Sequence, residues 1–209
     1  MRGTIEEAES NLRARGEREI VIFHIHWLNS LFRGVIDAKV ARRRVTEFIA
    51  RLNRFKASGG KIVFTVHNEI SHEAPFSVDE ISLSRAIVEL SDVVHLHEWN
   101  SRTEVMAFEI PPEKVVIVPH GHYVGEYKNT LNRHEARKIL GFNEEDEVIL
   151  FSGLIRKYKG VATLIECFRL LLRERKNLKL LLIGSIVEDP ISELSEPLSA
   201  SELDSITLS

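Results

Sequence analysis

The stretch from Glu147 to Ser185, EVILFSGLIRKYKGVATLIECFRLLLRERKNLKLLLIGS, decides the fold. Its apolar runs at 148–151 and 178–183 are too short for helices, and a glycine follows each of them, Gly153 and Gly184. Between the runs, apolar residues recur at helical spacing with Glu and Arg on the other side: Val161, Leu164, Ile165, Phe168, Leu171 and Leu172. Strand, polar loop, amphipathic helix and strand together predict a right-handed parallel βαβ unit.

The polar loop of this unit, 152–160 (SGLIRKYKG), predicts an anion-binding site. In open α/β sheets, ligands bind beyond the carboxyl ends of the strands. Gly153 lets a ligand approach the backbone, and a helix N-terminus already attracts anions. Three cations add positive charge there: Arg156, Lys157 and Lys159. The alternative interpretation is a basic loop on an ordinary turn between strand and helix.

Composition narrows the class of protein. The chain has 209 residues, of which 44% are hydrophobic and 28% charged, enough for one large or two small globular domains. A net charge of −3 argues against a general nucleic-acid binder, so we expect no nucleic-acid partner. Cys167 is the single cysteine, which favours a reducing compartment. With no apolar run of membrane-spanning length and no signal-peptide core, we expect a cytoplasmic protein.

Strands and helices alternate along the rest of the chain, the pattern of a doubly wound parallel sheet. Capping-box patterns predict three further helix starts, at Ser77–Glu80, Ser101–Glu104 and Asn132–Glu135. Apolar runs predict strands at 20–25, 61–66, 93–96, 115–118 and 205–208. We therefore expect an α/β fold of two Rossmann-like domains, 1–128 and 129–209, with the boundary segment at 123–132. The second domain is expected to be incomplete, because a sheet that stops near 208 leaves an exposed edge.

Histidines gather at the predicted strand ends. Six of the nine form His-x-His pairs: His24/His26, His95/His97 and His120/His122. Residues two apart on a strand share a face, so each pair could chelate a metal, and His67, His72 and Glu73 follow another strand. A zinc or iron hydrolase is thus a rival hypothesis. Against it, no HExxH motif occurs and no Asp lies in a ligating pattern with the pairs.

The predicted helix at 36–56 carries a basic face opposite its apolar stripe. Four basic residues lie away from the stripe, namely Lys39, Arg43, Arg51 and Arg54, and two more add charge, Arg42 and Arg44. Such a face is attracted to anionic lipid, which predicts a peripheral contact with an anionic membrane surface. A solvated basic face without a membrane partner is the alternative.

The same deciding stretch resembles a known family. GLIRKYKGVATLIECF is similar to the first strand, loop and helix of the C-terminal domain in glycosyltransferases of the GT-B fold, most of all the large family 4. In that family a loop of the form G-x-(x)-R-x-x-K-G precedes the helix. The resemblance implies that Arg156 and Lys159 face the diphosphate of a nucleotide-sugar donor. It places Gly153 and Gly184 in the same donor site, with no metal and no cofactor.

Three earlier segments extend the resemblance in the expected order. IVFTVHN resembles the strand that ends in a His beside the acceptor and donor sugar, which makes His67 the candidate catalytic residue. FHIHWL resembles a strand motif of bacterial exopolysaccharide-type members, and VIVPHGHY resembles the segment that enters the interdomain cleft, with His120 in place of the usual Asn. The implied acceptor or cleft residues are His26, Trp27, Asn68, His72, Glu73, His120, Gly121 and Tyr123.

Two pieces of the family pattern are not found. Nothing before Ile20 supplies the first strand and its Gly-rich loop. The family's Glu-x7-Glu segment has no counterpart either, because the pair Glu188/Glu196 comes too early. We therefore expect a chain truncated at both ends and weakly active or inactive by itself. The resemblance implies transfer of a hexose to a glycan or lipid-linked acceptor; a non-catalytic remnant that binds sugar or nucleotide is the alternative.

Overall fold

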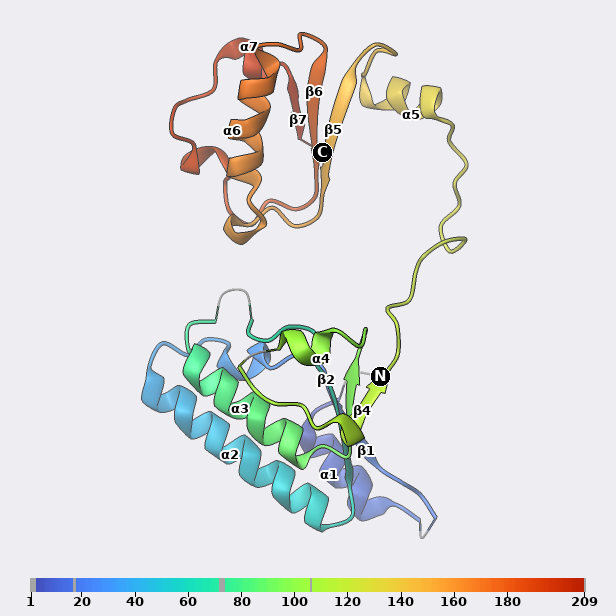
Figure 1. Cartoon of the computed structure of the whole chain (residues 1–209), viewed down its shortest axis with the longest axis vertical. Helices are drawn as coiled ribbons and strands as arrows, with labels where there is room; N and C mark the ends of the chain where they lie inside the picture. Colours follow the sequence, from blue (N-terminus) through green and yellow to red (C-terminus); the bar gives the residue numbers. More distant parts are fainter. Residues whose placement is uncertain (1–2, 17, 72–73, 106, 209) are drawn as a thin grey trace. The chain divides into compact units, whose positions relative to one another are not determined.

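The computed structural model describes residues 3–16, 18–71, 74–105 and 107–208, which form two compact units. The first unit is Met1–His122 and the second is Tyr123–Ser209, so the division falls at the start of the predicted boundary segment. Each unit contains one parallel sheet with helices packed against it (Figure 1). The predicted α/β class with parallel sheets is confirmed.

The first unit holds a four-stranded sheet in the order β1-β2-β3-β4, with all neighbours parallel. Parallel strands that follow one another in space as in sequence have right-handed crossovers, which place the connecting helices on one face. Its elements are α1 (Ile5–Ala14), β1 (Ile22–Ile25), η1 (Asn29–Phe32), α2 (Ala38–Ala57), β2 (Lys61–Thr65), α3 (Ser77–Leu90), β3 (Val93–Leu96), α4 (Ser101–Glu104), η2 (Pro112–Lys114) and β4 (Val115–Ile117).

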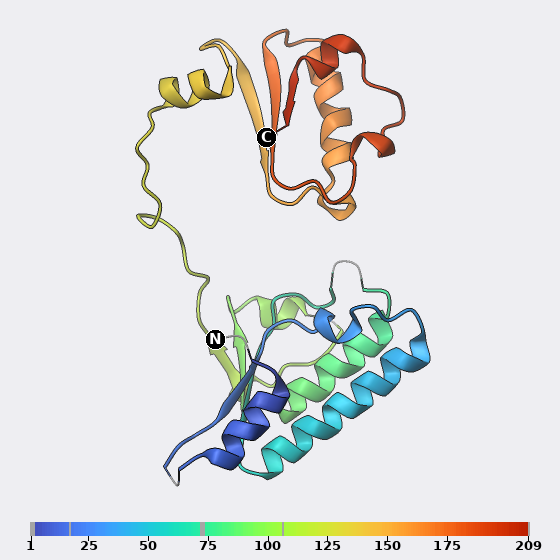
Figure 2. The same ribbon diagram turned by 180° about the vertical axis from the view of Figure 1, so that it is seen from behind.

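Alternation along these strands separates an apolar face from a polar one. The apolar face packs under α2 and α3, which lie side by side in both views (Figures 1 and 2). Its buried residues are Ile25, Ile62, Phe64, Val94 and Leu96. The register sets His24 opposite Val63 and Thr65 opposite His95, so both pairs lie on the other face. The same register therefore gathers the strand-end histidines on one side of the sheet.

The second unit holds a three-stranded parallel sheet in the order β5-β6-β7. Its core forms where α6 packs on β6: Val161, Ile165 and Phe168 against Leu178, Leu180 and Leu182. The predicted βαβ unit is confirmed, and the strand expected at 205–208 is β7 beside β6. Its elements are α5 (Arg133–Leu140), β5 (Glu147–Ser152), η3 (Lys157–Lys159), α6 (Val161–Leu172), β6 (Leu178–Ile183), η4 (Ile191–Glu193), α7 (Ala200–Leu203) and β7 (Ile206–Leu208).

Of the three predicted capping boxes, only Asn132–Glu135 is confirmed, and Gly141 ends that helix with φ 76°. The prediction at Ser77–Glu80 is wrong, because Phe76 is the N-cap of α3. The Glu80 carboxylate instead accepts hydrogen bonds from the backbone N–H and the hydroxyl of Ser71, at 2.8 and 2.6 Å. The prediction at Ser101–Glu104 is also wrong, since Asn100 is the N-cap and no side chain caps α4. Tertiary contacts override the local pattern in the Glu80 case.

Candidate functional site

The predicted site residues fall into two groups, one in each unit. Arg156, Lys159 and the two strand-end glycines belong to the second unit, and the histidines with Trp27 belong to the first. Each group lies at the carboxyl edge of its own sheet, where α/β proteins place their ligands. We describe each group within its own unit.

In the second unit, the loops that follow β5 and β6 run alongside each other. Gly153 N–H donates to the Ile183 carbonyl at 2.9 Å, and Ile155 N–H donates to the Ser185 carbonyl at 3.0 Å. The side chain of Ile155 is buried. Gly153 and Gly184 have φ of 138° and 144°, and a Cβ at Gly184 would lie 1.9 Å from the Gly153 oxygen. Only glycine at 184 permits the two loops to approach this closely.

The three cations of the loop have different surroundings. Arg156, the residue before η3, is half-buried. Lys157 is tied to the acidic tail, because its Nζ lies 3.2 Å from Glu193 Oε1. Lys159 Nζ lies over the Tyr158 ring, 5.1 Å from the centroid, and has no ion-pair partner among the described residues. Lys159 is therefore available to an anion, whereas Lys157 is already engaged.

The N-terminus of α6 follows directly. Its N-cap is Gly160, with φ 70°, and no side chain caps the first turn. The first-turn N–H groups of such a helix have no partner within the helix, and the helix dipole adds partial positive charge. Arg156, Lys159 and this helix end thus belong to one short loop that suits a phosphate-bearing ligand.

Sequence reasoning missed the role of Glu188. Its carboxylate accepts a hydrogen bond from the Lys157 backbone N–H at 2.6 Å, at the start of η3. Glu188 therefore takes one of the N–H groups of the basic loop, while those of Lys159 and Gly160 donate to carbonyls within the loop. The available signal was an acidic residue, Glu188, in the loop directly after β6.

In the first unit, five histidines and one threonine lie in contact across β1, β2 and β3. His26 Nδ1 lies 3.1 Å from His67 Nε2, and His67 Nδ1 lies 3.4 Å from His97 Nε2. In a second row, Thr65 Oγ1 lies 2.7 Å from His24 Nε2 and 2.9 Å from His95 Nδ1. We call these six residues the imidazole network: His24, His26, Thr65, His67, His95 and His97. Thr65 was not among the sequence-based candidates, and its place on the histidine face of β2 was the signal.

Trp27 borders the network. Its ring stacks on His67 with centroids 4.2 Å apart and planes within 7°. Trp27 remains 54% exposed, so it offers apolar ring surface next to imidazole nitrogens. Aromatic rings beside polar groups are common in ligand pockets, where they supply contact area and the polar atoms supply orientation. His120 stacks on His97 with centroids 4.3 Å apart and extends the same patch.

Burial and mutual repulsion lower the pKa values of three of the imidazoles, those of His24, His26 and His67. The pKa of His67 is lowered from its ordinary value to about 4, first by desolvation and then by the neighbouring histidines, His26 foremost. The pKa values of His24 and His26 are lowered as well, again mainly by desolvation and then by other histidines. A second positive charge in so tight a group is costly.

Two of the remaining predicted cleft residues, Asn68 and Gly121, belong to the first unit and do not join the network. Asn68 and Gly121 are exposed. Tyr123 belongs to the second unit, is 70% exposed and packs on Tyr127 with centroids 5.7 Å apart. His72 and Glu73 lie outside the described residues. Within residues 3–16, 18–71, 74–105 and 107–208, no group of three or more His, Cys, Asp or Glu is arranged to hold a metal ion.

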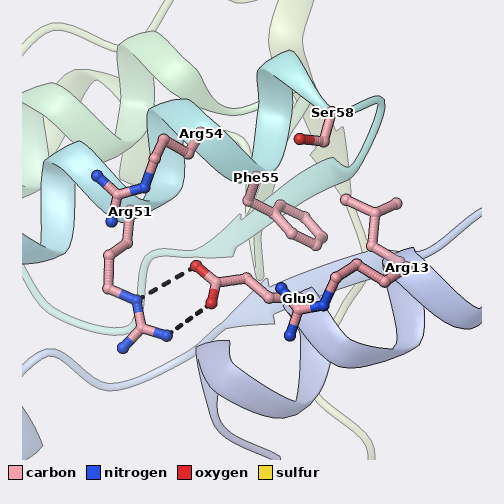
Figure 3. Close-up of a pocket in the computed structure, with 7 residues that line it drawn as sticks. Glu9, Arg13, Arg51, Arg54, Phe55 and Ser58 are labelled. Carbon is pink, nitrogen blue, oxygen red and sulfur yellow. Dashed lines mark hydrogen bonds and ion pairs between the residues drawn. The ribbon is translucent and has the colours of Figure 1, made fainter.

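A cavity of about 480 Å³ lies between α1 and the last turns of α2 (Figure 3). It is lined by Glu9, Leu12, Arg13, Arg51, Arg54, Phe55 and Ser58. Two of these residues are paired: Arg51 Nη2 donates to Glu9 Oε2 at 2.7 Å (Figure 3). The last turn of α2 leads into the amino end of β2, so this cavity is at the edge of the sheet opposite to the imidazole network.

Much of the basic face of α2 is neutralised within the first unit. Arg42 pairs with Asp79 at 3.3 Å and Arg43 with Glu47 at 3.2 Å, while Arg51 also contacts Glu6. Lys39 and Arg54 have no ion-pair partner in the part of the chain that the structure describes. The charge that reaches solvent is therefore smaller than the sequence suggests. None of the helices within the described residues combines the length and apolar character needed to cross a membrane.

Comparison with known proteins adds to this geometry. Residues 132–202 match the family Glycosyl transferases group 1. The matched segment contains α5, the basic loop, α6 and β6. A lipopolysaccharide 1,2-N-acetylglucosaminetransferase of Salmonella typhimurium is 33% identical over 75 residues, which cover 36% of this chain and 19% of that protein.

Solved structures support the fold over a longer range. Anabaena HepE in complex with UDP superposes with a TM-score of 0.63 at 14% identity, covering 97% of this chain and 50% of that one. Its complex with UDP and glucose gives 0.59 at 16% identity, covering 80% and 45%. The chain thus spans about half the length of these structures. The resemblance to GT-B glycosyltransferases that the motifs indicate is confirmed.

Proposed function

We propose that this chain is a glycosyltransferase, or the part of one, that transfers a hexose from a nucleotide-sugar to a glycan or lipid-linked acceptor. The donor would bind at the loop 153–160 of the second unit and the acceptor beside the imidazole network and Trp27 of the first. The observation that carries the proposal is the basic loop after β5, where two glycine backbones touch and an uncapped helix begins.

The donor site follows from charge and space. A nucleotide-sugar brings a diphosphate, which needs positive charge and N–H donors at close range. Arg156 can grip phosphate oxygens with two N–H groups, while Lys159 acts as a mobile point charge. The absence of side chains at Gly153 and Gly184 lets the donor approach the strand ends. With these cations and the helix dipole, we propose that the diphosphate is neutralised by the protein without a metal ion.

Related proteins support the choice of donor class. HepE is described in complex with UDP and glucose, and the Salmonella relative is named an N-acetylglucosaminetransferase. Both descriptions fit a nucleotide-sugar with a hexose, and they make UDP the first nucleotide to test. We carry over this ligand class as part of the proposal, together with a polysaccharide or lipopolysaccharide glycan as the acceptor.

Calorimetry with UDP and UDP-glucose, with and without EDTA, tests the donor site on the full chain. Arg156→Ala and Lys159→Ala should each weaken binding roughly tenfold to a hundredfold, because hydrogen bonds to charged groups contribute about 1.5–3 kcal/mol. Lys157→Ala is the matched control, since its ammonium is paired with Glu193. Equal losses in all three variants would make the loop a diffuse basic patch. Loss of binding in EDTA would contradict the metal-independent site.

A non-catalytic sugar- or nucleotide-binding role is the alternative. Transfer from radiolabelled UDP-glucose to a glycan acceptor separates the two, because a binding module would take up UDP and yield no labelled product. Binding in calorimetry together with product formation supports the transferase.

A further inference from the structure

The imidazole network forms two hydrogen-bonded rows that meet at one carbonyl oxygen. Val118 O lies 3.0 Å from His95 Nε2 and 3.3 Å from His97 Nδ1. The first row runs from His97 through His67 to His26, and the second from His95 through Thr65 to His24. Both rows therefore cross the sheet from the strand end of β4 to β1.

The carbonyl decides where every proton of the first row lies. A carbonyl oxygen accepts only, so His97 must carry its proton on Nδ1. The other nitrogen of neutral His97, Nε2, is then an acceptor, and His67 must donate to it from Nδ1. By the same step His67 Nε2 accepts and His26 donates from Nδ1. His26 is left with an unprotonated Nε2, which has no hydrogen-bond partner among the described residues.

The second row follows the same logic through a hydroxyl group. His95 donates from Nε2 to Val118 O, so its Nδ1 accepts the Thr65 hydroxyl proton. The Thr65 oxygen in turn accepts from His24 Nε2. His24 ends the row with an unprotonated Nδ1. A carbonyl has two lone pairs, and the two rows use both of them.

We propose that the imidazole network is a polarised acceptor site, in which Val118 O fixes the tautomers so that His26 Nε2 faces a hydroxyl group of the ligand as an unprotonated nitrogen. The ligand class is a sugar or other polyol. If the chain is the transferase proposed above, this hydroxyl is the attacking group of the acceptor; that identification rests on the proposed function. His26 is then the contacting residue, and His67 and His97 are positioning residues.

The site requires neutral imidazoles, and its surroundings favour them. The groups that contact His26 and His67 are other histidines and the Trp27 ring. No ion pair joins a carboxylate to a network histidine within the described residues. The lowered pKa values of His24, His26 and His67 agree with neutral imidazoles at these three positions at neutral pH.

The first row also provides a path for proton transfer from His26 to His97. When His26 Nε2 takes the hydroxyl proton, His26 can pass its Nδ1 proton to His67 Nε2. His67 can then pass its own Nδ1 proton to His97 Nε2. The hydroxyl oxygen keeps the electron pair, one proton has entered the row, and the positive charge comes to rest on His97 beside Val118 O. Atoms and charge balance at each step.

Two-bond ¹H–¹⁵N correlation spectra of the ¹⁵N-histidine-labelled full chain, recorded above pH 7, test the assignment. We expect His26, His67 and His97 to be protonated on Nδ1, and His24 and His95 on Nε2. This mixture is the pattern that ordering of both rows by Val118 O requires. A proton on Nε2 of His26 or His67 would overturn the proposal, whatever the outcome of the donor-binding experiments.

Two variants test the two rows independently of each other. His97→Phe removes the acceptor of His67 Nδ1, so the tautomers of His67 and His26 should become mixed. Thr65→Val breaks only the second row, so His24 should become mixed while His26 and His67 keep their tautomers. An unchanged His26 in His97→Phe would refute the relay. If either variant fails to fold, the spectrum of the unmodified chain still decides the assignment.

Addition of methyl α-glucoside tests the ligand class. The ¹⁵N resonance of His26 Nε2 should move more than any other ring nitrogen, with His134 of the second unit as the unaffected control. No shift at His26, or an equal shift at His134, would refute a polyol site. Because this titration needs no nucleotide, its failure is distinct from a failure of the donor site.

Discussion

The backbones of Gly184 and Gly153 touch at the carboxyl edge of the β5-β6-β7 sheet, so that a Cβ at Gly184 would lie 1.9 Å from the Gly153 oxygen. This contact brings together the two loops that border the basic segment 156–160. Gly184 also has φ 144°, where a side chain is strained whatever the space. The donor site thus depends on a backbone contact as well as on charge.

Gly184→Ala should destabilise the second unit by more than about 1–3 kcal/mol, the usual cost of one strained residue, because the backbone clash adds to it. The measurement is hydrogen exchange of the β5 and β6 amides in the full chain. Gly153→Ala is the matched control: its φ of 138° is strained, but a Cβ there meets no atom within 4 Å. Equal effects of the two substitutions would contradict the contact.

His67→Ala should lower the stability of the first unit by about 1–2 kcal/mol, since the stacked Trp27 ring and two nitrogen contacts are lost. His67→Phe keeps the stack and should recover part of that loss. Urea unfolding followed by tryptophan fluorescence reports on this unit, because Trp27 and Trp99 both belong to it. His134→Ala, in the second unit, should leave the transition unchanged. A phenylalanine variant no more stable than the alanine variant would argue against the stack.

Acidification should destabilise the first unit between pH 7 and pH 5. The pKa of His67 is about 4 in the folded chain and about 6.5 when unfolded, so below pH 6.5 the unfolded state binds the extra proton. The free energy of unfolding therefore falls as pH falls toward 4. His24 and His26 add changes of the same sign.

The same urea unfolding, repeated across this pH range, measures the effect. His67→Phe should flatten the dependence, whereas His134→Ala should not. Asp92 does not contribute in this window: desolvation raises its pKa, but the hydrogen bonds that it accepts from Ile62 and Lys61 outweigh this and lower the pKa, so its loss of stability lies at lower pH. A pH dependence as steep in His67→Phe as in the unmodified chain would contradict the assignment.

Contact of segment 36–56 with an anionic membrane should be weak and easily screened. Only Lys39 and Arg54 among the basic residues discussed lack an ion pair or a hydrogen-bond acceptor in the described chain, and each cation near anionic lipid contributes about 1 kcal/mol. Sedimentation with phosphatidylserine vesicles should show slight binding that salt abolishes. Lys39→Ala with Arg54→Ala should remove it. Strong binding that survives the double substitution would show that the paired arginines open toward lipid.

The sequence by itself determined the local architecture. Apolar periodicity between 147 and 185 specified the βαβ unit, and Asn132 with Glu135 specified the start of α5, because both signals depend on residues close together in the chain. The motif in the basic loop also indicated the family resemblance that the match of 132–202 confirmed. The sequence also showed that the loop 152–160 carries one arginine and two lysines and that it follows a strand.

Only the tertiary structure decided which of these residues meet. The parallel register of β1, β2 and β3 sets Thr65 beside His95 and joins the histidines into rows that end on Val118 O. Packing in the second unit pairs Lys157 with Glu193 and leaves Lys159 available. In the first unit, the contact with Ser71 draws Glu80 away from its predicted cap. These partners are far apart in sequence, and a backbone carbonyl has no signature in the sequence at all. Local patterns fix an element, whereas strand register and packing fix the contacts between elements.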